Sequence, residues 1–159
     1  MPKLFLDCDG VLADFDAGAR AALGGMTPHQ FEERHGKREF WKRLANTPDF
    51  YATLPLMPDA QTLFDAVEHL RPTILTGLPL GIWAAPQKVA WAERHFPASP
   101  IITCMARDKV HYMKPGDVLV DDREDHRDKW EDAGGLFVTH ENAERSIAAL
   151  RQIFPSVGG

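Results

Sequence analysis

The sequence of 159 residues has few cysteines, no long apolar run and no excess of basic residues. Its two cysteines, Cys8 and Cys104, form no C-x-x-C pair, which argues against a disulfide-stabilised secreted domain and favours a reducing compartment. No stretch approaches the roughly 20 apolar residues of a membrane-spanning helix. The apolar run before the first acidic residue is only three residues long, so we expect no signal peptide. These absences predict a cytoplasmic protein that does not enter a membrane.

The charge balance is acidic, with a formal net charge of −5. Binding to nucleic acid through a broadly basic surface is therefore not expected. An anionic substrate would have to be captured locally, by a metal ion or by a few lysine and arginine side chains. The length is that of one domain with at most a small insertion. Nothing in the sequence indicates an oligomeric state.

Short apolar runs alternate with segments of helical periodicity along most of the chain. The runs predict strands at residues 4–6, 72–76, 100–103, 117–120 and 135–139. The periodic segments predict helices at residues 59–70, 86–96, 123–133 and 143–154. This alternation predicts an α/β fold, a Rossmann-like three-layer sandwich with a central parallel sheet of about five strands. Ligands of such sheets bind at the carboxyl ends of the strands.

Residues 14–57 interrupt this alternation, because they lack a clear strand and are rich in helix formers, phenylalanine and charge. Short helices are predicted at residues 28–34 and 38–44. We interpret the segment as a small helical cap inserted after strand 1, over the edge of the sheet where ligands bind. The predicted core is then formed by residues 1–13 and 58–159, and the cap by residues 14–57.

Acidic residues follow two of the predicted strands. Asp7, Asp9 and a glycine at a sharp turn, Gly10, follow the first strand, and Asp121 and Asp122 follow the fourth. If these strands are neighbours, four carboxylates converge, and their repulsion is costly unless a cation or protons neutralise it. A carboxylate-rich, all-oxygen site suits Mg²⁺. The sequence therefore predicts a magnesium site.

This arrangement also suits phosphate-ester hydrolysis. A carboxylate such as Asp7 can attack phosphorus and form an aspartyl-phosphate. Its own charge must first be offset, which Mg²⁺ and a lysine can do. A second acid two residues later, Asp9, can protonate the leaving oxygen and then activate water. We therefore expect a phosphomonoester hydrolase with Asp7 as nucleophile and Asp9 as acid/base.

Simpler interpretations of each motif exist. An Asp-x-Asp-Gly turn or an Asp-Asp pair is common in structural turns and helix caps. The two motifs together, each after a separate apolar strand, are much harder to explain in that way. A calcium-binding EF-hand would need Asp or Asn at residue 11, which is Val11. The seven histidines show no H-x-x-x-H spacing, so zinc is not favoured.

At these residues the chain resembles the haloacid dehalogenase (HAD) superfamily. The superfamily's first motif is matched by residues 7–11, Asp-Cys-Asp-Gly-Val, its second by Thr76, and its fourth by Asp121 and Asp122. The resemblance covers nearly the whole chain. Within the superfamily the chain is most similar to the 5′(3′)-deoxyribonucleotidase group, through residues 7–15, 88–96 and the Arg-Asp-Lys at 107–109.

The resemblance implies a role for each acidic residue. Asp7 would be nucleophile and metal ligand. Asp9 would be acid/base and would bind Mg²⁺ through its backbone carbonyl. Asp122 would bind the metal directly, and Asp121 would support the metal site without contacting the metal.

The resemblance also implies which residues hold the phosphate. Thr76 and the backbone of Gly77 would contact phosphate oxygens, and Lys109 would be the phosphate-contacting lysine, with Lys88 and Lys114 as alternatives. For the last two we consider a solvated side chain the better expectation. Thr76 could also be a simple helix cap.

The implied substrate is a small phosphorylated molecule, a nucleoside monophosphate and especially a deoxyribonucleotide. Arg107 would belong to the substrate site. Phe15, Phe40 and Trp41 could stack on a base, although aromatic residues in a short helical cap more often form its small core. The chain departs from the group in its shorter cap and in Gly77, where a serine is usual. The alternative functions are a nucleic-acid 3′-phosphatase and a non-catalytic phosphate-binding module.

Overall fold

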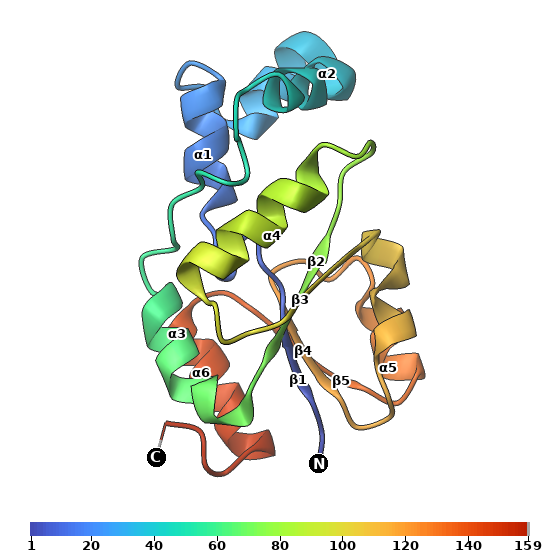
Figure 1. The fold of residues 1–159 in the computed structure, drawn as a ribbon. Coiled ribbons are helices and arrows are strands. Elements are labelled where there is room, and N and C mark those ends of the chain that lie inside the picture. The colour runs from blue at the N-terminus through green and yellow to red at the C-terminus, as the bar shows by residue number, and fades with distance from the viewer. Residues whose placement is uncertain (159) are drawn as a thin grey trace.

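A computed structural model describes residues 1–158 of the chain. Its centre is a single parallel sheet with the strand order β3-β2-β1-β4-β5 (Figure 1). The strands are β1 (Leu4–Leu6), β2 (Thr73–Gly77), β3 (Ile101–Cys104), β4 (Val118–Asp121) and β5 (Leu136–Thr139). Each lies within one residue of its predicted position, and the predicted α/β sandwich with a parallel five-stranded sheet is confirmed.

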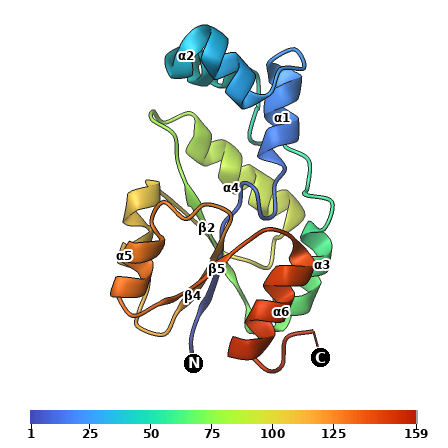
Figure 2. The ribbon, with the colours of Figure 1, turned by 180° about the vertical axis from the view of Figure 1, so that it is seen from behind.

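Helices cover both faces of this sheet (Figures 1 and 2). They are α3 (Ala60–Val67), which continues as the 3₁₀-helix η1 (Glu68–Leu70), α4 (Ala84–His95), α5 (Arg127–Asp132) and α6 (Ala143–Ile153). Successive strand residues point to opposite faces. Leu4 and Leu6 pack into the core beneath α3, α4 and α6, whereas Phe5 packs with Trp130 of α5 on the other face. Both faces of β1 are thus buried, which fixes the strand at the centre of the sheet.

The cap begins directly after the turn that follows β1. It contains α1 (Phe15–Ala22) and α2 (Pro28–Ala45), which lie beyond the carboxyl ends of the strands (Figure 1). Within residues 1–158, no strand is found between β1 and β2. Helix α2 begins at a capping box formed by Thr27 and Gln30, and it is kinked at Gly36, whose φ is 85°. The kink separates the two short helical segments that the sequence predicts.

In the cap, α1 was not among the predicted helices, and in the core two elements differ from the sequence prediction. Helix α5 begins at Arg127 rather than at residue 123, because the chain leaving β4 first turns around the site, where the backbone N–H of Arg123 donates to Asp121 Oδ1 at 3.0 Å. A second 3₁₀-helix, η2 (Ala106–Tyr112), follows β3 and was not predicted. It carries Lys109 to the carboxyl end of the sheet. None of the helices in residues 1–158 is long and apolar enough to cross a membrane.

Candidate active site

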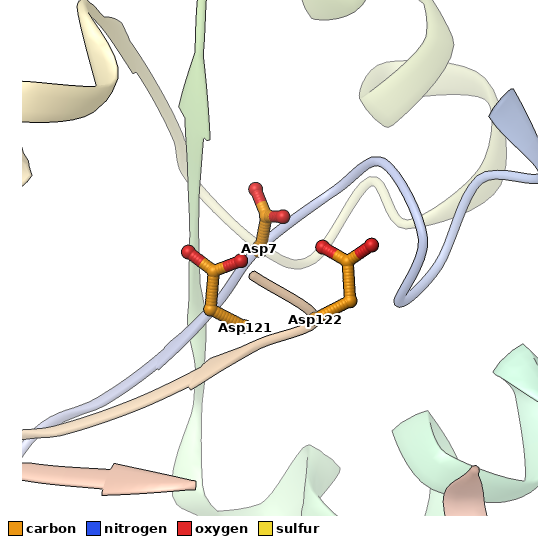
Figure 3. A group of neighbouring side chains, drawn as sticks. All are labelled: Asp7, Asp121 and Asp122. Atoms are coloured by element: carbon orange, nitrogen blue, oxygen red, sulfur yellow. The ribbon is translucent and has the colours of Figure 1, made fainter. Parts of the chain in front are cut away.

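The acidic cluster lies at the carboxyl ends of two hydrogen-bonded neighbours, β1 and β4. The backbone N–H of Asp7 donates to Val120 O at 2.9 Å, so Asp7 extends the ladder one residue beyond β1. One carboxylate oxygen each of Asp7, Asp121 and Asp122 lies within 4.8 Å of the others. Figure 3 shows the three side chains leaving adjacent strand ends toward the same side. Three of the four carboxylates expected to converge are therefore brought together, whereas Asp9 lies outside this cluster.

A buried lysine lies between two of these carboxylates. Lys109 Nζ is 3.1 Å from Asp7 Oδ1 and 2.9 Å from Asp121 Oδ2. Burial alone would favour the neutral amine, but the two carboxylates outweigh it and raise the pKa of Lys109. Burial likewise opposes the ionisation of Asp121, yet the charge and hydrogen bond of Lys109 lower the pKa of this carboxyl. Lys109 and Asp121 thus form a buried ion pair beside Asp7.

One lysine does not balance three carboxylates. Burial, together with the charges of Asp121, Asp9 and Asp122, raises the pKa of Asp7 well above its usual value despite Lys109. Burial and Asp121 raise the pKa of Asp122 to about 6. The site therefore has an excess of negative charge and an all-oxygen donor set. Both properties fit a hard divalent cation such as Mg²⁺, which Asp7, Asp121 and Asp122 could hold.

A second buried lysine lies on the other side of the β1 turn. Lys88 Nζ donates to Asp9 Oδ2 at 2.7 Å, to Thr76 Oγ1 at 2.8 Å and to Gly77 O at 2.8 Å. The expectation that Lys88 is solvated is wrong, because its side chain is only 2% exposed. A signal was present in the sequence, since Ala84, Trp91 and Ala92 share the buried face of α4 with it at helical spacing.

Thr76 belongs to the same buried network. Its side chain is fully buried at the end of β2, and its hydroxyl oxygen accepts the hydrogen bond from Lys88. Thr76 does not line the cleft above the carboxylates, whereas Gly77, the next residue, does. No helix begins at Thr76, so the alternative role as a helix cap does not apply.

The cleft above the carboxylates has a volume of about 900 Å³. The predicted residues that line it are Asp7, Asp9, Phe15, Trp41, Gly77, Arg107, Lys109, Asp121 and Asp122. Lys114 does not line it; this residue is exposed on the loop that leads into the amino-terminal end of β4. Position in the fold therefore removes Lys114 as a candidate phosphate lysine.

Aromatic side chains of the cap form one wall of the cleft. The ring centroids of Phe15 and Trp41 are 6.2 Å apart, and those of Phe15 and Tyr51 are 6.1 Å apart. Trp41 is 37% exposed and Phe15 is partly buried. Phe40 also lines the cleft, but it is buried and so contributes to the core of the cap as well. Tyr51 was not predicted, and only its aromatic character could have drawn attention to it.

Two glycines allow close approach around the site. Gly10 has a φ of +83°, and a Cβ placed there would overlap the carboxylate of Asp122. Glycine is therefore required both by the turn after β1 and by the position of Asp122. At Gly77 a Cβ would lie 3.1 Å from Ala106 Cβ. This tight contact accounts for glycine where a serine is usual in the group that the chain resembles.

The substitution Gly10→Ala should displace Asp122. We expect Mg²⁺ affinity, measured by isothermal titration calorimetry, to fall by about tenfold or more, as when a group that orients a metal ligand is lost. Gly116→Ala is the matched control, because Gly116 has a φ of +94° and no atom within 4 Å of its built Cβ. The control carries similar backbone strain but should keep wild-type affinity. Equal losses in both variants would contradict the steric explanation.

Comparisons with known proteins agree with the geometry. The chain matches the family model described as 5′ nucleotidase, deoxy (pyrimidine), cytosolic type C protein (NT5C) over residues 1–151. No curated protein matches its sequence at a significant level. The residues matched by the family model include the whole acidic cluster and both buried lysines.

Two solved structures share the fold. A hydrolase from Streptococcus pneumoniae TIGR4 is similar with a TM-score of 0.52 and 14% identity, over 96% of this chain and 97% of that chain. An HAD family hydrolase from Deinococcus radiodurans R1, with bound phosphate and sodium, is similar with a TM-score of 0.52 and 13% identity, over 97% of this chain and 88% of that chain. At these identities the likeness shows the fold alone. Together with the nearly complete family match, it confirms the resemblance to HAD hydrolases, and the chain belongs to the NT5C family of HAD-type 5′-nucleotidases and is a phosphatase.

Proposed function

We propose that the chain is a Mg²⁺-dependent phosphomonoester hydrolase that acts through an aspartyl-phosphate on Asp7, with nucleoside monophosphates and especially deoxyribonucleotides as substrates. The observation that carries the proposal is the cluster of Asp7, Asp121 and Asp122 within 4.8 Å at the cleft, with Lys109 bridging two of them. A cluster of this kind can hold a cation and present a carboxylate to phosphorus at the same place.

The proposed metal ligands are the carboxylates of Asp7 and Asp122 and the backbone carbonyl of Asp9. Asp121, held by Lys109 and by the backbone N–H of Arg123, would support them. When bound, Mg²⁺ would offset the negative charges of the carboxylates and the phosphate. The donor set fits this ion because all of its atoms are oxygen.

The chemical steps are carried by residues of the chain. A carboxylate oxygen of Asp7 attacks phosphorus, the bond from phosphorus to the ester oxygen breaks, and the leaving oxygen takes a proton from Asp9. Asp9 then takes a proton from water, which attacks the aspartyl-phosphate and releases phosphate and the free Asp7 carboxylate. Asp9 is placed for this role, because it lines the cleft and its side chain is 26% exposed.

Phosphate oxygens would be held beside Asp7. Lys109 lines the cleft and can donate to them, as can the backbone of Gly77 and the side chain of Arg107. Thr76 is fully buried and does not line the cleft, so we assign it no direct contact with phosphate; its hydroxyl oxygen accepts from Lys88. The donors that line the cleft would stabilise the charge that develops on phosphate during transfer.

Asp7→Asn should abolish turnover while leaving the fold intact, because the amide cannot attack phosphorus. We expect phosphate release to fall by at least about a thousandfold, on the scale of losing a catalytic nucleophile. Asp65→Asn, an exposed change on α3, is the matched control and should keep full activity. If Asp7→Asn, purified free of host phosphatases, retained most of its activity, Asp7 would not be the nucleophile.

Removal of divalent metal should silence the enzyme. Without a cation the excess negative charge of Asp7, Asp121 and Asp122 repels a phosphate dianion. We expect activity to be lost in EDTA and restored by Mg²⁺, as measured by phosphate release after dialysis. Full activity of the metal-free protein would refute the role of Mg²⁺.

The cap supports a nucleotide as substrate. We propose that residues 14–57 form a cap distinct from the core at 1–13 and 58–159, and that Phe15 and Trp41 on its cleft-facing side stack on the base. We further propose a cytoplasmic location, because Cys8 and Cys104 are free and buried and the family is described as a cytosolic type. Nucleic acid is not expected as substrate, given the net charge of −5.

The substitution Trp41→Ala should show whether Trp41 stacks on the base of the substrate or only packs within the core of the cap. We expect KM for deoxyribonucleoside monophosphates to rise about tenfold, since one stacked base contributes on the order of 1–3 kcal/mol, while KM for p-nitrophenyl phosphate stays the same. Wild-type rates on mononucleotides should exceed those on 3′-phosphorylated oligonucleotides. The reverse preference would favour the nucleic-acid 3′-phosphatase instead.

A further inference from the structure

The buried side chain of Lys88 has no place in the chemistry described so far. We propose that Lys88 is a positioning residue that fixes the carboxyl group of Asp9 for proton transfer to the leaving group. The inference rests on the proposed function, because it assigns Asp9 the acid/base role. It goes beyond that proposal because the acid/base role of Asp9 then depends on Lys88, a residue of α4 that does not contact the substrate.

The ammonium group of Lys88 uses all three of its N–H donors in hydrogen bonds. An ammonium has three N–H donors, and the three acceptors at 2.7–2.8 Å are Asp9 Oδ2, Thr76 Oγ1 and Gly77 O. The ring of Tyr51 lies over the same nitrogen, 4.6 Å from ring centroid to Nζ. Lys88 therefore joins α4, the turn after β1 and the end of β2 at a single charged atom.

This geometry gives the two oxygens of Asp9 different surroundings. Oδ2 is bound to Lys88, whereas Oδ1 is buried and has no partner among the described residues. Rotation of the carboxyl group would break the charge-assisted bond to Lys88. Lys88 thus holds Asp9 in one orientation, with its partly exposed carboxyl group beside the cleft.

Direct contact between Lys88 and phosphate does not explain its position. Lys88 does not line the cleft, whereas Lys109 does. Stability alone does not explain it either, because burying an ammonium is costly and an apolar side chain of similar volume often serves the fold as well. The three N–H donors of Lys88 bind Asp9, Thr76 and the backbone carbonyl of Gly77. The orientation that these bonds impose on the Asp9 carboxyl group accounts for a lysine at this buried position.

The test compares two substrates that differ in their need for a proton. The leaving group of a deoxyribonucleoside monophosphate is an alkoxide and needs Asp9 as acid, whereas nitrophenolate leaves from p-nitrophenyl phosphate without one. The constant kcat/KM reports only the steps up to formation of the aspartyl-phosphate. We expect Lys88→Met to lower kcat/KM about 100-fold for the nucleotide and to change it little for p-nitrophenyl phosphate.

Four companion variants make the result specific. Asp9→Asn should show the same dependence on leaving group. The double variant Asp9→Asn/Lys88→Met should be no slower than Asp9→Asn, because the two single changes remove the same function. Lys114→Met, which removes an exposed lysine far from the cleft, should match wild type on both substrates. Lys88→Gln, shorter but polar, is a second variant that should reproduce the effect of Lys88→Met.

The outcomes separate the two proposals. An equal loss on both substrates, or no loss on the nucleotide, would overturn the role of Lys88 while leaving Asp7 and Asp9 as proposed. If both Lys88 variants fail to fold by circular dichroism, Lys88 maintains the fold rather than the orientation of Asp9, and the inference also fails. Failure of the proposed function would instead appear as retained activity in Asp7→Asn.

Discussion

The concentration of negative charge at the ends of β1 and β4 is the constraint on which the rest of the site depends. Asp7, Asp121 and Asp122 approach one another because their strands are parallel neighbours, and burial, together with the charges of the neighbouring carboxylates, raises the pKa of Asp7 and of Asp122. Lys109 compensates only part of the charge. The remaining excess is what suits the site to a divalent cation, and Gly10 is required so that Asp122 can lie against the β1 turn.

Two buried lysines divide the carboxylates of the β1 turn between them. Lys109 pairs with Asp7 and Asp121 on the side of η2, and Lys88 pairs with Asp9 on the side of α4. Asp7 and Asp9 are only two residues apart in sequence, yet they lie in separate ion pairs. Nucleophilic and acid/base roles require carboxylates in different environments, and this division supplies the difference.

The strands and the acidic cluster could be predicted from the sequence because their signals are local. An apolar run that ends in Asp7 or Asp121 defines both a strand and the position of its carboxylate. The burial of Lys88 was missed because a lysine on a helix is ordinarily solvated, although its spacing from Ala84, Trp91 and Ala92 placed it on the buried face of α4. The helix η2 and the contribution of Tyr51 depend on contacts between segments far apart in the chain.

Helix α4 links the acid/base residue to the cap. The backbone N–H of Tyr51 donates to Gln87 Oε1 at 2.8 Å, and Trp91 Nε1 donates to Leu54 O at 2.8 Å. Lys88 lies between Gln87 and Trp91 in the sequence, and the ring of Tyr51 packs against its ammonium group. The same turns of α4 therefore hold the chain that leads out of the cap and the carboxyl of Asp9. A change that moves Tyr51 alters both the wall of the cleft and the surroundings of Lys88, so the proposed roles of the cap in substrate choice and of Lys88 in proton transfer are coupled through this ring.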